Sequence, residues 1–202
     1  MKLIPMKIEH MGFAISEDEL LIFIGTIAGE CYNSSMDKDK CITRALNCIK
    51  RGHHSPLEHA NITLKCTVDR GVSHALVRHR HCAFQQSSTI YQRFIETEYI
   101  DGHEAQLPDK QSAYRQAEIY YKMLLNNGLA PSSARDVLPN GLATNLIITT
   151  NMRQWQYMFR RRNGPGDSDN MHMWAKMVRE WFEERYPRIT TAFDLWYERH
   201  PL

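Results

Sequence analysis

Apolar residues recur at helical spacing over much of the chain. Ser16 and Glu19 have the spacing of a capping box, and apolar residues follow at every third or fourth position, so we expect a helix to about Cys31. Longer helices are expected over 39–50, 111–125, 151–161 and 168–185, and shorter helical runs from Gly71 into residues 78–80 and from Pro131 to Leu138. Boundary residues support these limits: Gly52, Asn127-Gly128, Asn151, and Pro187 as the stop of the last helix.

Strict alternation over residues 61–68 predicts a half-buried strand, because every second residue is apolar. Thr150-Asn151 has the pattern of a strand-to-helix junction, with Asn151 as N-cap. Helices dominate, and strands do not alternate with them as in βαβ units. We therefore expect a mixed α/β (α+β) fold, and in the absence of repeats or linkers a single domain over residues 1–202.

Composition indicates an ordinary globular protein. The chain has 202 residues, 43% of them hydrophobic and 24% charged, with a net charge of +2. This balance gives no general argument for binding nucleic acid. Five cysteines without C-x-x-C spacing, no signal peptide and no segment long enough to span a bilayer predict a soluble, cytoplasmic protein with no membrane partner.

The candidate chemistry is concentrated between His53 and Phe94, around the cationic triplet Arg78-His79-Arg80. Six of the ten histidines fall in this stretch, and the triplet leads into the polar run Gln85-Gln86-Ser87-Ser88-Thr89. Guanidinium groups, imidazoles and small hydroxyls together favour a ligand that carries phosphate. No G-x-G-x-x-G or Walker motif occurs, so side chains must hold any phosphate.

Other interpretations of these residues remain open. His79 and His81, if they lie on a strand, share one face and could bind a metal, although the flanking arginines repel a cation. The histidines could instead satisfy backbone groups only. Ser88 could act as a nucleophile, but its hydroxyl is better suited to binding a phosphate or a base. Arg160-Arg161-Arg162 could bind phosphate or simply end a helix in solvent.

Five ordered motifs resemble those of the flavin-dependent thymidylate synthases. The triplet followed after seven residues by Ser88 is the central one. The other motifs are Gly52-His53-x-Ser55-Pro56-x-Glu58-His59, Asp69-Arg70-Gly71-Val72-Ser73-His74, Ala134-Arg135-x-Val137-Leu138-Pro139-Asn140, and Thr150-Asn151-x-Arg153-x-Trp155 with Phe159 and Arg162 after it. The similarity extends from about Cys31 to Pro187.

The resemblance implies a homotetramer with a mixed sheet flanked by long helices and FAD held at subunit interfaces. It implies methylation of a pyrimidine nucleotide at C5, most simply dUMP to dTMP, with methylenetetrahydrofolate as carbon donor and NADPH as reductant. FAD contacts carry over to His53, Ser55, Glu58, Arg78, His79, Arg80 and Arg162. The nucleotide site is expected at Gln86, Ser87, Ser88, Thr89 and His172, with Arg78 and Ser88 as catalytic residues. No cysteine nucleophile and no metal are implied.

Departures from the family pattern fall mainly on the nucleotide side. Family members carry arginine at the positions of Ile90 and His172, and often near Asn145; Ala75 and Ala83 also depart. Arg93, Arg160 or Arg161 could compensate. Alternatively, the pocket serves another nucleotide (dCMP, UMP or CMP, for methylation or hydroxymethylation). A weaker alternative is a flavin- or nucleic-acid-binding protein without turnover.

Overall fold

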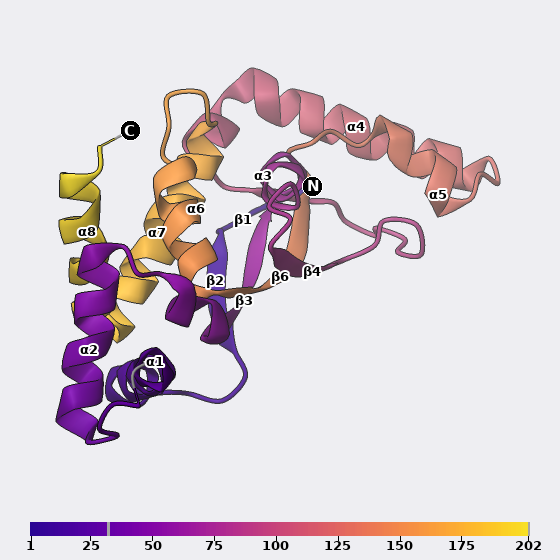
Figure 1. Ribbon diagram of the computed structural model, residues 1–202. Helices are drawn as coiled ribbons and strands as arrows, with labels where there is room; N and C mark the ends of the chain where they lie inside the picture. Colours follow the sequence, from indigo (N-terminus) through magenta and orange to yellow (C-terminus); the bar gives the residue numbers. More distant parts are fainter. Residues whose placement is uncertain (32, 202) are drawn as a thin grey trace. The chain divides into compact units, whose positions relative to one another are not determined.

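The computed structural model describes residues 1–31 and 33–201 and combines helices with short strands (Figure 1). The α-helices are α1 Glu17–Glu30, α2 Lys38–Arg51, α3 Arg70–Leu76, α4 Pro108–Asn126, α5 Pro131–Ala134, α6 Met152–Arg161, α7 Asp169–Arg185 and α8 Pro187–Arg199. The strands are β1 Lys2–Ile4, β2 Lys7–Met11, β3 Asn61–Asp69, β4 Cys82–Gln86, β5 Glu98–Ile100 and β6 Ala143–Asn151. Three 3-10 turns complete the order: η1 Ser55–His59, η2 His103–Gln106 and η3 Arg135–Val137.

The strands form a four-stranded sheet in the order β2-β3-β6-β4 and a two-stranded pair of β1 with β5. β1 and β5 run parallel, with Lys2 opposite Glu98. In the larger sheet the Thr63 hydroxyl meets that of Thr149 at 2.9 Å, and the Thr67 hydroxyl donates to Asn145 Oδ1 at 2.8 Å. Residue numbers rise along β3 as they fall along β6, so this pair is antiparallel. The predicted mixture of helices and mixed strand pairing is confirmed.

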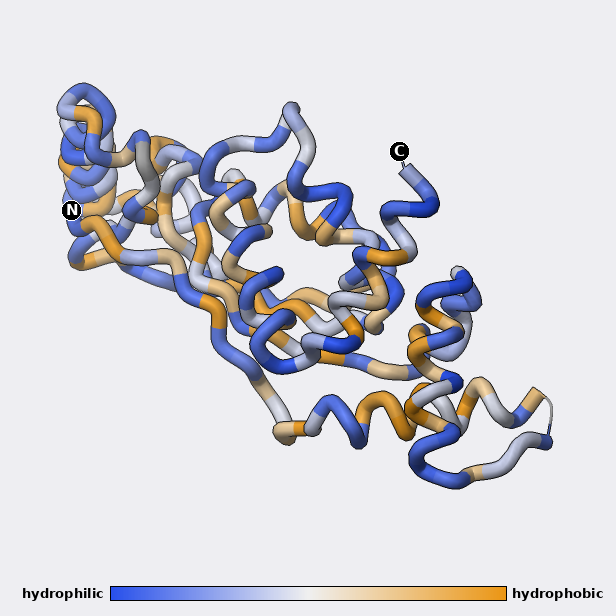
Figure 2. The backbone as a smooth tube through the Cα atoms, turned by 90° about the vertical axis from the view of Figure 1, so that its left-hand side faces the viewer, coloured by the Kyte–Doolittle hydropathy of each residue, from blue (hydrophilic) through white to orange (hydrophobic). Residues whose placement is uncertain are grey.

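Helix boundaries follow the capping residues in the sequence. Ser16 Oγ accepts from the Glu19 N–H at 3.3 Å while the Glu19 carboxylate accepts from the Ser16 N–H at 2.8 Å, so the predicted capping box is present. Gly52 ends α2 with a φ of +79°, a conformation that favours glycine. Asn151 Oδ1 accepts from the Gln154 N–H at the start of α6. Figure 2 shows hydrophobic (orange) and hydrophilic (blue) residues interspersed along the coiled segments of the backbone.

Pro187 has a second role that the sequence pattern did not predict. It ends α7 as expected, but it is also at the start of α8. Proline suits a first helical turn because its missing N–H has no partner there in any case. The helical run toward the arginine triplet is also shorter than expected, since α3 ends at Leu76 and residues 78–81 form a turn.

The chain divides into two compact units. Unit 1 comprises Met1–Glu9, Leu64–Ile148 and Pro165–Trp174. Its core includes the rings of Tyr99 and Tyr114, stacked with centroids 4.0 Å apart. Unit 2 comprises His10–Thr63, Thr149–Gly164 and Ala175–Leu202. The rings of Trp155, Phe159 and Phe182 pack together in it. That the whole chain acts as one domain stays a prediction.

Within residues 1–31 and 33–201, no helix combines the length and apolar content needed to cross a bilayer.

Candidate functional site

The arginine triplet lies in the turn that joins α3 to β4 in unit 1. Asp69 Oδ1 accepts from the Val72 N–H at 2.7 Å and fixes the start of α3. The His79 N–H donates to the Leu76 carbonyl at 3.0 Å, which closes the turn after the helix. His79 is only 6% exposed, whereas Arg78 and Arg80 are exposed on either side of it. Neither guanidinium forms a hydrogen bond or an ion pair with any residue that the structure describes, so both are available to an anionic ligand.

This geometry does not support the metal interpretation of His79 and His81. The two residues lie in a turn rather than on a strand, with His79 buried and His81 exposed, so strand alternation does not place them on one face. The described part of the chain contains no group of three or more His, Cys, Asp or Glu side chains arranged for a metal.

The polar run after the triplet is held by β6 and α3. The Gln86 side-chain amide donates to Ser73 Oγ at 2.9 Å, and the Ser87 N–H donates to the Asn145 carbonyl at 2.9 Å. Ser88 Oγ accepts from the Ile90 N–H at 3.1 Å, which stabilises the turn. No histidine or carboxylate among the described residues hydrogen-bonds Ser88, so the geometry favours binding over a nucleophilic role.

Thr89 lies beside two arginines, Arg70 and Arg135, that we did not predict as site residues from the sequence. Arg135 donates through one terminal nitrogen to Thr89 Oγ1 at 2.8 Å and through Nε to the Ser132 carbonyl at 3.1 Å. Arg70 and Arg135 both line a pocket of about 230 Å³ beside Thr89. Both residues belong to motifs that resemble the family's, but 64 positions separate them (135 − 70 − 1), so only the fold brings them together.

His172 lies on α7, half-buried, in the same unit as the triplet. Two residues earlier, the Asn170 amide donates to Asp69 Oδ2 at 2.5 Å. The start of α7 is therefore tied to the residue that caps α3.

The remaining predicted FAD residues belong to unit 2, where α1, α2 and η1 enclose a cavity of about 840 Å³. His53 and Ser55 line it, with Lys40, Arg44 and Arg51. Arg44 is fixed by donating to the carbonyls of Gly25 at 2.7 Å and Ser35 at 2.9 Å. The cavity volume is in the range of ligand-binding sites. Several cations line the cavity, and Asp39 is the one carboxylate among its lining residues, so the cavity fits a phosphate-bearing group such as FAD.

The other two predicted FAD contacts of unit 2, Glu58 and Arg162, are not among the residues that line this cavity. The Glu58 carboxylate is ion-paired with Arg153, and both side chains are about half exposed. Arg162 is 9% exposed at the C-terminal end of α6. The neighbouring Arg160 lies over the ring of Tyr197, 5.2 Å from its centroid, so it packs within unit 2.

Burial raises the thiol pKa of two cysteines, Cys66 and Cys48. Burial raises the pKa of Cys66 to about 12, although the Trp174 indole N–H, 3.4 Å from its sulfur, opposes the shift. Burial also raises the pKa of Cys48 at the unit 2 cavity. Neither thiol is set up as a thiolate nucleophile near neutral pH.

Comparisons with known proteins give the context for this geometry. Residues 19–188 match the Thy1 family model, described as thymidylate synthase complementing protein. A flavin-dependent thymidylate synthase of Corynebacterium aurimucosum is 30% identical over 212 aligned positions, 89% of this chain and 82% of the relative. One of Sulfolobus acidocaldarius is 32% identical over 139 positions, 65% of this chain, and the match covers only about half (53%) of that relative.

Among solved structures, a UMP/dUMP methylase, PolB, from Streptomyces cacaoi, bound with 5-Br dUMP, superimposes with a TM-score of 0.76. The match covers 96% of this chain and 97% of that one at 20% identity, which supports the fold. Because the family match spans 170 residues (188 − 19 + 1) of the 202, the chain belongs to the Thy1 family of thymidylate synthase complementing proteins.

Proposed function

We propose that this protein is a flavin-dependent enzyme that methylates a pyrimidine nucleotide at C5, converting dUMP to dTMP. The observation that carries the proposal is the exposed Arg78–Arg80 pair, followed at family spacing by Ser88, inside a family match over residues 19–188. Relatives named flavin-dependent thymidylate synthase support the same reaction class.

The proposed FAD contacts are His53, Ser55, Glu58, Arg78, His79, Arg80 and Arg162. The cationic members neutralise the pyrophosphate, and the unit 2 cavity offers further cations at Arg44 and Arg51. Bound flavin, reduced by NADPH, supplies the hydride that brings the one-carbon group of methylenetetrahydrofolate to the methyl level. We propose a homotetramer, with FAD at subunit interfaces, as the family resemblance implies.

The chain's own residues bind and polarise the nucleotide. Arg78 carries a permanent charge and has no partner among the described residues, so it can stabilise negative charge that develops on the pyrimidine ring. Gln86, Ser87, Ser88, Thr89 and His172 provide amide, hydroxyl and imidazole groups for the nucleotide. Cys66 is not needed as a nucleophile, in keeping with its raised pKa.

A second candidate is the same reaction on UMP. Asn145, near which the family often has an arginine, is engaged by Thr67 through a 2.8 Å hydrogen bond, and Ile90 has no polar side chain. The fold neighbour from Streptomyces cacaoi is named as a UMP/dUMP methylase, which makes a ribonucleotide substrate a specific alternative.

The test is product formation by purified, flavin-loaded protein offered dUMP, UMP, dCMP and CMP with NADPH and methylenetetrahydrofolate. We expect dTMP from dUMP, and an Arg78→Ala variant about 100-fold slower or worse, from the loss of charge stabilisation. Arg115→Ala, on an exposed face of α4, is the matched control and keeps full activity. A preference for UMP selects the second candidate, and flavin binding with no methylated product from any nucleotide contradicts both.

A further inference from the structure

The segment 52–55, which carries two of the predicted flavin contacts, packs against α8. His53 and Ser55 are exposed and line the unit 2 cavity, whereas His54 between them is half-buried and is not among the lining residues. Nε2 of His54 lies 3.2 Å from the Ile49 carbonyl oxygen of α2, and because a carbonyl only accepts, this nitrogen donates. The side chain of His54 therefore anchors the segment while its two neighbours face the cavity.

Trp196 of α8 contacts this segment at two places. Its ring meets the His54 ring edge-on, with centroids 4.8 Å apart and planes at 67°. A Cβ at Gly52 would lie only 2.9 Å from the indole nitrogen of Trp196, so the absence of a side chain at Gly52 lets the indole approach the backbone. Because Gly52 and His54 flank His53, the indole restrains the backbone on both sides of that predicted contact.

Trp196 is itself held by its neighbours. The His200 ring stacks on it with centroids 4.9 Å apart, and His200 Nδ1 lies 2.9 Å from the Trp196 carbonyl oxygen. The next residue, Tyr197, donates its hydroxyl to the Gln156 carbonyl of α6. Arg160, also on α6, lies over the Tyr197 ring. The end of α8 is therefore tied to α6, which keeps the indole in place.

The surroundings of His54 keep its imidazole neutral near neutral pH. Burial lowers the pKa of His54 below its ordinary value of 6.5, and the hydrogen bond to the α2 carbonyl opposes this shift only in part. The charges of Arg153, His200 and His53 lower the pKa further. A neutral ring has no charge to desolvate, so it packs against Trp196 without that cost.

Residues outside the family match make these contacts. The match ends at residue 188, whereas Trp196 lies near the end of α8 and His200 directly after it. His54 occupies the position that the upstream family motif leaves open. The pairing of His54 with Trp196 is thus a property of this chain's own residues.

We propose that Trp196 and His200 are positioning residues for the flavin. They hold the segment 52–55 so that His53 and Ser55 are already ordered at the cavity before flavin binds. Side chains ordered in advance remove part of the entropy cost of binding. This inference rests on the proposed function for the identity of the ligand, and it adds the residues that prepare the ligand's site.

The experiment titrates full-length, flavin-free protein with FAD and follows the quenching of flavin fluorescence. Trp196→Ala is expected to weaken FAD binding about 10-fold, because the flavin must then order His53 and Ser55 itself. Trp196→Phe retains an aromatic edge for His54 and should weaken binding about threefold or less. His200→Ala, which removes only the support of the indole, should fall between wild type and Trp196→Ala.

Trp181→Ala is the matched control for a general loss of packing. Trp181 is a half-buried tryptophan of α7 in the same unit, and it packs against Phe182 and Tyr186 and does not line the cavity. Its loss should lower the thermal unfolding midpoint, as Trp196→Ala does, but leave the FAD dissociation constant within about twofold of wild type.

The outcomes separate positioning from folding and from the reaction. FAD dissociation constants of Trp196→Ala and His200→Ala that equal the wild-type value would overturn the positioning role, and an equal weakening in Trp181→Ala would overturn it as well. His200 is exposed, so His200→Ala keeps the test available if Trp196→Ala does not fold. Selective weakening in these variants, with recovery in Trp196→Phe, supports the proposal even if no nucleotide is methylated, in which case only the proposed reaction fails.

Discussion

The arginines of this protein differ in whether protein groups already hold them. Arg44 and Arg135 donate to backbone carbonyls, and Arg160 lies on an aromatic ring, so each is fixed by the fold. Arg78 and Arg80 are exposed, with no such contact to any described residue. Fixed cations shape a site in advance, whereas exposed ones become ordered with the ligand. Arg78 and Arg80 thus belong to the second kind, and Arg135 beside Thr89 belongs to the first.

Glu118 on α4 is expected to make stability depend on pH. Burial alone would raise its pKa, but hydrogen bonds from Lys122, the Met1 ammonium and Thr97 outweigh burial and hold the pKa at about 2, below its ordinary value of 4.5. A lowered folded-state pKa stabilises the native state above pH 4.5, and this contribution is lost as the pH falls from 4.5 toward 2. We predict that Glu118→Gln loses about 1–3 kcal/mol at pH 7 and that the difference shrinks in that acid window.

Urea unfolding at pH 7 and at pH 3 measures this difference. Glu180→Gln is the control, because its carboxylate is exposed and lies 3.8 Å from Lys176. A Glu118→Gln penalty that is the same at both pH values would rule out this source of acid sensitivity.

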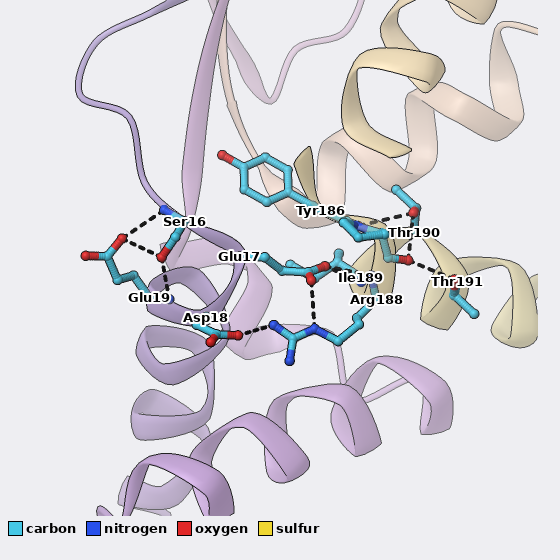
Figure 3. A network of polar contacts seen from close by, with 10 residues as sticks. Ser16, Glu17, Asp18, Glu19, Tyr186, Arg188, Ile189, Thr190 and Thr191 are labelled. Carbon is cyan, nitrogen blue, oxygen red and sulfur yellow. Dashed lines mark hydrogen bonds and ion pairs between the residues drawn. The ribbon is translucent and has the colours of Figure 1, made fainter. Parts of the chain in front are cut away.

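At the scale of elements, a side chain of α1 caps the first turn of α8 (Figure 3). Tyr186, the N-cap of α8, gives no side-chain cap, and the Glu17 carboxylate instead accepts from the N–H groups of Arg188 at 2.7 Å and Ile189 at 3.0 Å. The Arg188 guanidinium also donates to Glu17 at 2.7 Å and reaches Asp18. Glu17 therefore acts as a helix cap from a distant part of the sequence.

We predict that Glu17→Ala costs about 1–2 kcal/mol of unfolding free energy, as for a lost helix cap. Asp18→Ala removes only the exposed partner of Arg188 and should cost less than about 1 kcal/mol. Chemical denaturation of the two variants makes the comparison. Equal losses of unfolding free energy in the two variants would mean that the ion pairs of Arg188, rather than the helix cap, stabilise the start of α8.

Close contact between α1 and α2 depends on Gly25. A Cβ there would lie 2.0 Å from the Cys41 carbonyl oxygen and 2.5 Å from its carbonyl carbon, so backbone would have to move. We predict that Gly25→Ala destabilises by about 1–3 kcal/mol or more and weakens flavin binding, because both helices line the unit 2 cavity.

Gly166→Ala is the matched control, since its Cβ would meet nothing within 4 Å. Thermal unfolding and flavin titration give the two readouts. A Gly25→Ala protein as stable as the control would contradict this packing.

What the sequence allowed us to predict depended on local signals. Ser16, Gly52 and Asn151 fixed helix ends because capping is decided within a few residues. The strands β1 and β5 were not predicted, because three residues are too few to show the alternation of apolar and polar positions that marks a strand. The triplet was found because its chemistry is contiguous. Arg70 and Arg135 were not paired, because their neighbourhood is created by tertiary structure.

At the scale of the whole molecule, family membership extends across both compact units, from residue 19 to residue 188. The proposed FAD residues are accordingly drawn from both units: His53, Ser55, Glu58 and Arg162 in unit 2, and Arg78, His79 and Arg80 in unit 1. A truncated chain would lack part of this set, so the central claim is tested on the full chain.

The most direct test is a single turnover without NADPH. Flavin-loaded protein is reduced chemically under anaerobic conditions and then mixed with methylenetetrahydrofolate and dUMP while the flavin absorbance is followed. We predict that the flavin is reoxidised only when both substrates are present, with one dTMP formed for each flavin. Flavin that stays reduced with dUMP and with UMP alike, and yields no methylated nucleotide, would contradict the proposed reaction.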